Sequence, residues 1–127
     1  MKLFTKTTLA VAGISLASMA FAADPLANTT WQTFDEGQPK GVVKITESNG
    51  VFTGKLISTV SEKGKKHVGM TVISGLKADG NGKYSGGQIT DPEKNKSYRM
   101  TANLSGDTLD IKGYLGPFSR SQTWKKK

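Results

Sequence analysis

Hydrophobic and polar residues alternate in short runs along most of this chain, starting near residue 30. The clearest run is Ser97 to Leu104, in which Tyr98, Met100 and Ala102 alternate with polar residues. Successive side chains of a strand point to opposite faces, so this period of two predicts strands with one buried face. A helical period of apolar residues does not persist after residue 29. The pattern therefore predicts an all-β domain.

Turn-forming residues separate eight such runs. The predicted strands cover residues 30–34, 41–48, 51–60, 68–76, 83–90, 97–104, 108–115 and 120–125. Asn49-Gly50 lies between two of them and is a strong hairpin signal, because both positions of the tight turn need positive φ. The connections are short, so each strand is expected to pair with its neighbour in sequence.

The predicted fold is a single eight-stranded antiparallel up-and-down β-barrel, in which the first strand pairs with the last. Closure removes the exposed edges of such a meander. Glycines within the predicted strands permit the sharp bends of a small barrel. These are Gly54, Gly86, Gly87 and Gly113. A β-sandwich with the glycines at bulges is the alternative.

The first 22 residues have the layout of a secretory signal peptide. Lys2 and Lys6 precede an apolar stretch from Leu9 to Phe21, and Ala20-Phe21-Ala22 fits a cleavage site. The apolar stretch is shorter than the roughly 20 residues that span a bilayer. We expect cleavage after Ala22, a mature domain of residues 23–127, and a periplasmic or secreted protein.

Composition narrows the possible partners. The chain has no Cys and a net charge of +8, of which Lys2 and Lys6 account for +2. The remaining +6 is usual for a small soluble domain. Most aromatic residues fall on predicted inner faces, so nucleic acid is not an expected partner. A basic loop with Lys63, Lys65 and Lys66 is a candidate for weak contact with an anionic surface, or simply a solvated loop.

No catalytic or metal-binding constellation is evident in the sequence. His67 is the only His, and a zinc site needs several N, S or O ligands. Asp91 and Glu93 flank Pro92 and are interpreted as turn formers rather than as an acid–base pair. We therefore expect no cofactor, no metal and no enzymatic activity.

Several short sequence motifs in the C-terminal third of the chain resemble those of one bacterial family. They are Ile89-Thr90-Asp91-Pro92, Ser97-Tyr98, Leu109 to Gly116, and Arg120 to Trp124. At this spacing the chain resembles the bacterial secreted proteins catalogued as domain of unknown function 2147. The resemblance implies a lipocalin-like barrel and carries no established activity. The Cys pair frequent in that family is missing here.

A lipocalin-like barrel implies a structural role for the C-terminal run. Such barrels commonly close one end with a Trp of the first strand stacked on an Arg near the last, here Trp31 and Arg120. Arg120, Gln122 and Trp124 are spaced by two, so they share one strand face. We expect Trp31, Arg120 and Trp124 to close the barrel.

The interior of the barrel is the expected site of function. An eight-stranded barrel is either filled by its own side chains or holds one small ligand. Five inward residues are candidates to bind a small apolar or amphipathic molecule: Phe52, Met70, Tyr84, Tyr98 and Met100. The alternative is a filled barrel in a non-enzymatic envelope or stress-related protein that acts through its outer surface.

Overall fold

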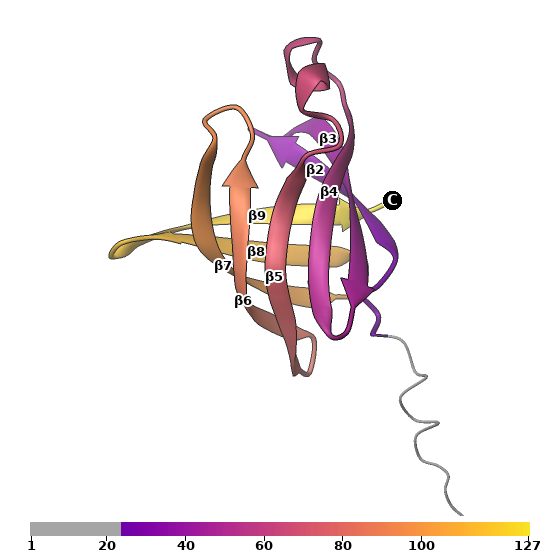
Figure 1. Ribbon diagram of the computed structural model, residues 1–127, viewed down its shortest axis with the longest axis vertical. Helices are drawn as coiled ribbons and strands as arrows, with labels where there is room; N and C mark the ends of the chain where they lie inside the picture. Colours follow the sequence, from indigo (N-terminus) through magenta and orange to yellow (C-terminus); the bar gives the residue numbers. More distant parts are fainter. Residues whose placement is uncertain (1–23) are drawn as a thin grey trace, which may run out of the picture.

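The computed structural model describes residues 24–127, which form one closed antiparallel barrel (Figure 1). Its strands follow one another around the barrel in sequence order. They are β2 (Thr29–Asp35), β3 (Gln38–Ser48), β4 (Val51–Thr59), β5 (Thr71–Gly80), β6 (Lys83–Asp91), β7 (Lys96–Ser105), β8 (Thr108–Leu115) and β9 (Phe118–Lys126). A 3-10 helix, η2 (Lys63–His67), connects β4 to β5. The predicted eight-stranded meander barrel is confirmed. The predicted signal peptide lies outside the described residues.

The turns and glycines follow the sequence signals. Asn49 and Gly50 join β3 to β4 with φ of 53° and 82°, the left-handed geometry expected of a two-residue hairpin. Gly54 permits close packing rather than a turn. A Cβ on Gly54 would lie 3.1 Å from both Val43 and Ile73, so only Gly fits between these core side chains.

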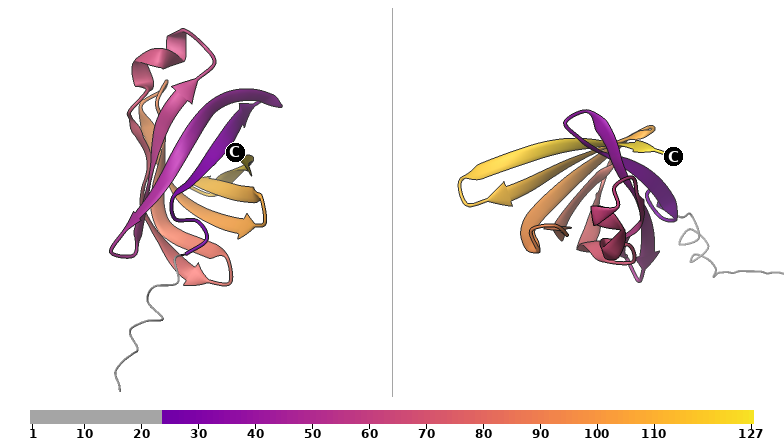
Figure 2. Two further views of the ribbon diagram at one scale, coloured as in Figure 1. Left: turned by 90° about the vertical axis from the view of Figure 1, so that its right-hand side faces the viewer. Right: turned by 90° about the horizontal axis from the view of Figure 1, so that it is seen from above.

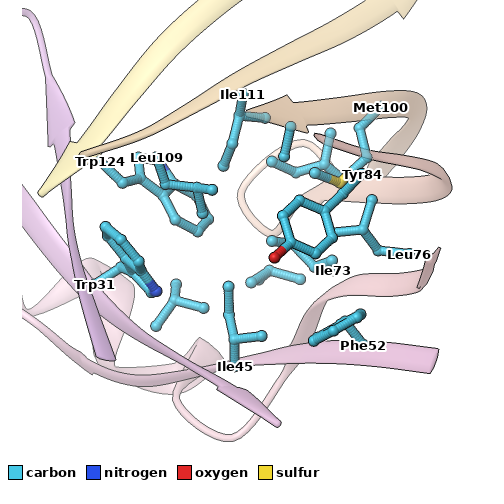
Figure 3. Packing of buried hydrophobic residues seen from close by; sticks show 14 of the residues in the cluster. Trp31, Ile45, Phe52, Ile73, Leu76, Tyr84, Met100, Leu109, Ile111 and Trp124 are labelled. Carbon is cyan, nitrogen blue, oxygen red and sulfur yellow. The ribbon is translucent and has the colours of Figure 1, made fainter. Parts of the chain in front are cut away.

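The core fills one half of the barrel. Its buried hydrophobic residues come from every strand and from the segment that precedes β2 (Figure 3). The cluster comprises Leu26, Trp31, Val43, Ile45, Phe52, Leu56, Val72, Ile73, Leu76, Tyr84, Ile89, Met100, Ala102, Leu109, Ile111 and Trp124. Leu26 is fully buried, so the segment Asp24–Asn28 covers this end of the barrel.

β5 departs from strict alternation. Ile73 is fully buried, and its direct neighbour Val72 is also buried. The β4–β5 register shifts on both sides of Gly54. A register shift changes which residues point inward, so both neighbours reach the core.

The barrel closes through a short seam between its first and last strands. Trp31 pairs with Lys126 and Gln32 with Lys125. The Lys127 N–H also donates to the Thr30 carbonyl at 2.9 Å. The expected pairing of the first strand with the last is therefore confirmed, but only over a few residues.

Beyond this seam β2 and β9 separate. The β2–β3 register shifts between Thr33 and Phe34, and such a bulge bends a strand. β9 and β8 continue as a hairpin that extends away from β2 (Figures 1 and 2). One end of the barrel is thus covered, and the other is open along one side.

Candidate ligand-binding cleft

A cavity of about 680 Å³ lies at the open end, between the diverging strands. Its lining comes from both edges of the gap and from the strands behind it. Apolar residues form its floor: Val43, Leu56, Val72, Ile89 and Trp124. Charged residues and one His stand around its mouth: Asp35, Glu36, Lys40, Asp91, Glu93, Lys94, Arg120 and His67. The cleft therefore combines an apolar interior with a polar entrance.

Gly113 helps to create this space. It lies on the inner face of β8, in line with buried Leu109 and Ile111, and pairs with Met100 on β7 and Arg120 on β9. A Cβ added there would meet Ile89 at 3.7 Å, an ordinary contact. A larger side chain would extend into the cavity. The missing side chain thus keeps part of the cleft open.

An ion pair spans part of the mouth. Lys40 Nζ of β3 lies 3.9 Å from Glu93 Oε2, in the turn between β6 and β7. Both side chains are 43% exposed, so the pair contributes at most about 1 kcal/mol to stability. Asp91 Oδ1 accepts hydrogen bonds from the backbone N–H groups of Glu93 (3.0 Å) and Lys94 (3.3 Å). Asp91 therefore forms the turn, as the sequence indicates.

The covered end holds a hydrogen-bonded network instead of a cavity. The Tyr84 hydroxyl donates to Asp24 Oδ1, which also accepts from the Leu26 N–H at 2.8 Å. Trp31 Nε1 donates to Thr29 Oγ1 at 2.7 Å, and that hydroxyl donates to the Leu26 carbonyl at 2.6 Å. Burial, together with the hydrogen bond to Asp24, raises the pKa of Tyr84 well above its usual value. These bonds fix the covering segment to the barrel.

The structure places only one of the five expected ligand-binding residues in the cleft. Tyr98 lines the cleft. Phe52, Tyr84 and Met100 are at most 2% exposed and pack in the filled half, where the Phe52 and Tyr84 rings meet edge to face at 5.3 Å. Met70 is half-buried just before β5 and does not line the cleft. Three of the five candidates are core residues, in the same packed cluster as Leu26 of the covering segment.

The closure residues also need correction. Trp31 and Trp124 are buried beside the seam (Figure 3). Arg120 is exposed and lies six residues before Lys126, the partner of Trp31, or about 20 Å along the strand. The expected stack of Arg120 on Trp31 is therefore wrong. Arg120 and Trp124 do share the inner face of β9, and Arg120 lines the cleft.

Some residues of the cleft were not expected from the sequence. Phe118 and Leu115 pair on the inner face of the β8–β9 hairpin but remain 73% and 64% exposed. The alternation of residues along β8 predicts that Leu115 points inward. It is nevertheless exposed, because the barrel is open at this position. The sequence indicates Gly113 only as a residue that permits a bend in the strand. Its missing side chain also leaves space in the cleft. The sequence did not mark Lys40 as a cleft residue, because its ion-pair partner Glu93 is far away in the chain.

Two further kinds of functional feature were sought in the described residues, a metal site and a membrane-spanning helix. Residues 24–127 contain no group of three or more His, Asp or Glu side chains placed to hold a metal ion. In the same residues, no helix is long and apolar enough to cross a membrane. Of the basic loop, Lys65 pairs with Glu62 at 2.6 Å and is more than half exposed.

Comparison with solved structures shows which class of fold the barrel belongs to. The fold is similar to that of HP1028 from the human pathogen Helicobacter pylori, a protein described as belonging to the lipocalin family. The TM-score is 0.64 with 21% sequence identity, and the match covers 79% of this chain and 82% of that one. The chain is thus a lipocalin-like β-barrel.

The family itself is shown by sequence. Residues 29–126 match the model of a family described as uncharacterized proteins conserved in bacteria, domain of unknown function 2147. The chain belongs to this family, as its C-terminal sequence motifs indicated. A comparison with curated proteins gave no significant match.

Proposed function

We propose that this protein is an exported binding protein that holds a small amphipathic molecule in the cleft between β2 and β9. The observation that carries the proposal is the cavity of about 680 Å³ at the open end of the barrel. Ligand pockets typically measure about 300–1,000 Å³ and combine apolar walls with a few polar groups. The cleft has both features.

The distribution of polarity favours an amphipathic ligand. The floor offers only apolar contacts around Val72, Ile89 and Trp124, whereas the mouth carries Lys40, Arg120 and several carboxylates. A molecule with an apolar body and a polar end satisfies both regions without leaving a polar group buried and unpaired. Because the lining offers these binding contacts, we propose binding without chemical conversion.

A second candidate is a protein that acts through its outer surface. It is favoured by the packed core, which fills the covered half of the barrel and leaves no room there for a ligand. The two candidates differ in whether the cleft takes up a molecule.

Ligand uptake is tested by filling the cleft. Gly113→Leu places a side chain over the floor and should reduce binding of a hydrophobic fluorophore at least tenfold. Lys112→Leu adds an apolar residue at the neighbouring exposed position of β8 and should leave binding unchanged. Circular dichroism confirms that both variants fold. Equal saturable binding by both variants, or none by the wild type, would contradict the proposal.

Export and the natural ligand are tested on the protein from its own host. The proposed signal peptide predicts a periplasmic or secreted form that begins at Ala23. Intact mass spectrometry of each cell fraction shows whether residues 1–22 are removed. Native mass spectrometry of the same preparation shows whether a small molecule is retained, and this mass should be lost in Gly113→Leu. A full-length cytoplasmic form would refute export.

A further inference from the structure

β9 has an open backbone edge beside the cleft. On one side it pairs with β8 without a register shift along its length, from Lys125 to Phe118. On the other side its ladder with β2 includes only Lys125 and Lys126. From Phe118 to Trp124, that side of β9 faces no other strand of the described chain. The protruding hairpin leaves this edge accessible (Figure 2).

Two hydrogen bonds determine which backbone groups point to the open edge. The Lys126 N–H donates to the Asp107 carbonyl at 2.8 Å, toward β8. The Lys127 N–H donates to the Thr30 carbonyl at 2.9 Å, toward β2. The direction alternates along an antiparallel strand, so every second residue before Lys127 points away from β8. These residues are Lys125, Thr123, Ser121 and Ser119.

The last three of these residues have no strand opposite them. An exposed strand edge with unpaired N–H and C=O groups is a template for an added strand. β2 already pairs with this edge of β9 at Lys125. The unpaired part of the edge follows directly along the same strand. A further strand at Ser119, Ser121 and Thr123 would therefore extend an existing pairing pattern.

Charge and apolar exposure indicate which strand would fit. β9 contains Arg120, Lys125 and Lys126 and no acidic residue. The exposed Phe118 and Leu115 stand on the same inner face as Arg120. A complementary strand carries a carboxylate opposite Arg120 and an apolar side chain opposite Phe118. A second copy of β9 would bring the same cations to the edge, and like charges across an interface oppose association.

We propose that the open edge of β9 binds an extended acidic segment of a partner protein as an added antiparallel strand. The segment's backbone pairs with Ser119, Ser121 and Thr123. Its alternate side chains contact Arg120 and Phe118 at the mouth of the cleft. This interaction uses the strand edge, whereas the proposed small ligand uses the apolar floor, so the two can be tested separately.

A designed peptide tests this interaction. Thr-Ser-Thr-Glu-Thr-Val-Thr-amide, with a fluorescent label on its N-terminal amine, places Glu opposite Arg120 and Val opposite Phe118 when it lies antiparallel to β9. Fluorescence anisotropy at low ionic strength should show saturable binding. Replacing Glu by Lys in the peptide should weaken binding at least tenfold. N-methylation of the Thr directly before Glu removes the backbone donor opposite Ser121 and should also weaken binding, although the side chains are unchanged.

Protein variants provide the matched controls. Ser121→Pro removes an edge N–H and leaves the β8 ladder intact, because proline is tolerated where the N–H faces away from the sheet. Its dissociation constant should rise by roughly five- to tenfold, as expected for one net hydrogen bond. Ser121→Ala keeps the N–H and should bind normally. Amide exchange should slow at Ser119, Ser121 and Thr123 when the peptide binds.

Several results would overturn the proposal. These are absence of saturable binding, equal affinity for the N-methylated peptide, or a concentration-dependent dimer that excludes the peptide from β9. The N-methylated peptide keeps the test valid if Ser121→Pro fails to fold. Gly113→Leu should still bind the peptide, so failure of the small-ligand proposal and failure of this one are distinguishable.

Discussion

The Tyr84 hydroxyl of β6 donates a hydrogen bond to Asp24 Oδ1, 60 residues earlier in the chain. This contact joins the segment before β2 to the far side of the barrel. It places Leu26 in the core and covers one end of the barrel. The open end is left as the place for a ligand, so the contact decides which half of the barrel is filled.

Removing this contact should destabilise the covered end. Tyr84→Phe keeps the ring that packs on Phe52 and removes the donor to Asp24. A hydrogen bond to a charged group contributes about 1.5–3 kcal/mol, so the free energy of unfolding should fall by roughly this amount. Urea denaturation measures the change. Tyr98→Phe, at the partly exposed cleft residue, is the control and should change stability by less than about 0.5 kcal/mol.

The raised pKa of Tyr84 predicts a loss of stability in alkaline solution. The folded state holds the phenol protonated above its usual pKa of about 10. The stabilisation is complete below about pH 10 and is lost as the pH rises through the higher folded pKa, because the unfolded state releases the proton first. Denaturation at pH 8 to 11 should show a steeper fall for the wild type than for Tyr84→Phe. Parallel curves would contradict the assignment.

Thr29 should be more important than its size suggests. Its hydroxyl accepts from Trp31 Nε1 and donates to the Leu26 carbonyl. Thr29→Val conserves the shape and leaves the buried indole N–H unsatisfied, which costs about 1–3 kcal/mol. In the Trp31→Phe background the same change should cost less, because the donor is already gone. A double-mutant cycle by thermal or urea unfolding measures this coupling, and full additivity would argue against it.

Arg120 and Trp124 share a strand face but should respond differently to truncation. Arg120→Ala removes an exposed side chain and should change the free energy of unfolding by no more than about 0.5 kcal/mol. Trp124→Ala removes a buried ring and should cost about 3–5 kcal/mol. Differential scanning calorimetry compares the two variants. A large effect of Arg120→Ala would restore a structural role for this residue.

Local patterns predicted the candidate site only in part. Tyr98 was found because its alternation marks an inner face and it happens to lie at the open end. Phe52, Tyr84 and Met100 carry the same signal, yet they are packed in the core cluster that includes Leu26. Alternation distinguishes inside from outside, but it contains no information on the position along the barrel axis.

Local patterns in the sequence predict the strands and their order, and they favour a closed barrel over a sandwich. These depend on local alternation, on turn residues such as Asn49-Gly50 and on short connections, which leave neighbouring strands little choice of partner. Three features are visible only in the folded barrel: which half is filled, how far the β2–β9 seam extends, and the position of Arg120 at an open cleft. These features arise from contacts between distant residues, Tyr84 with Asp24 and Trp31 with Lys126, and from register shifts at Thr33 and Gly54. Such contacts join residues that are far apart in the sequence, so no local pattern encodes them.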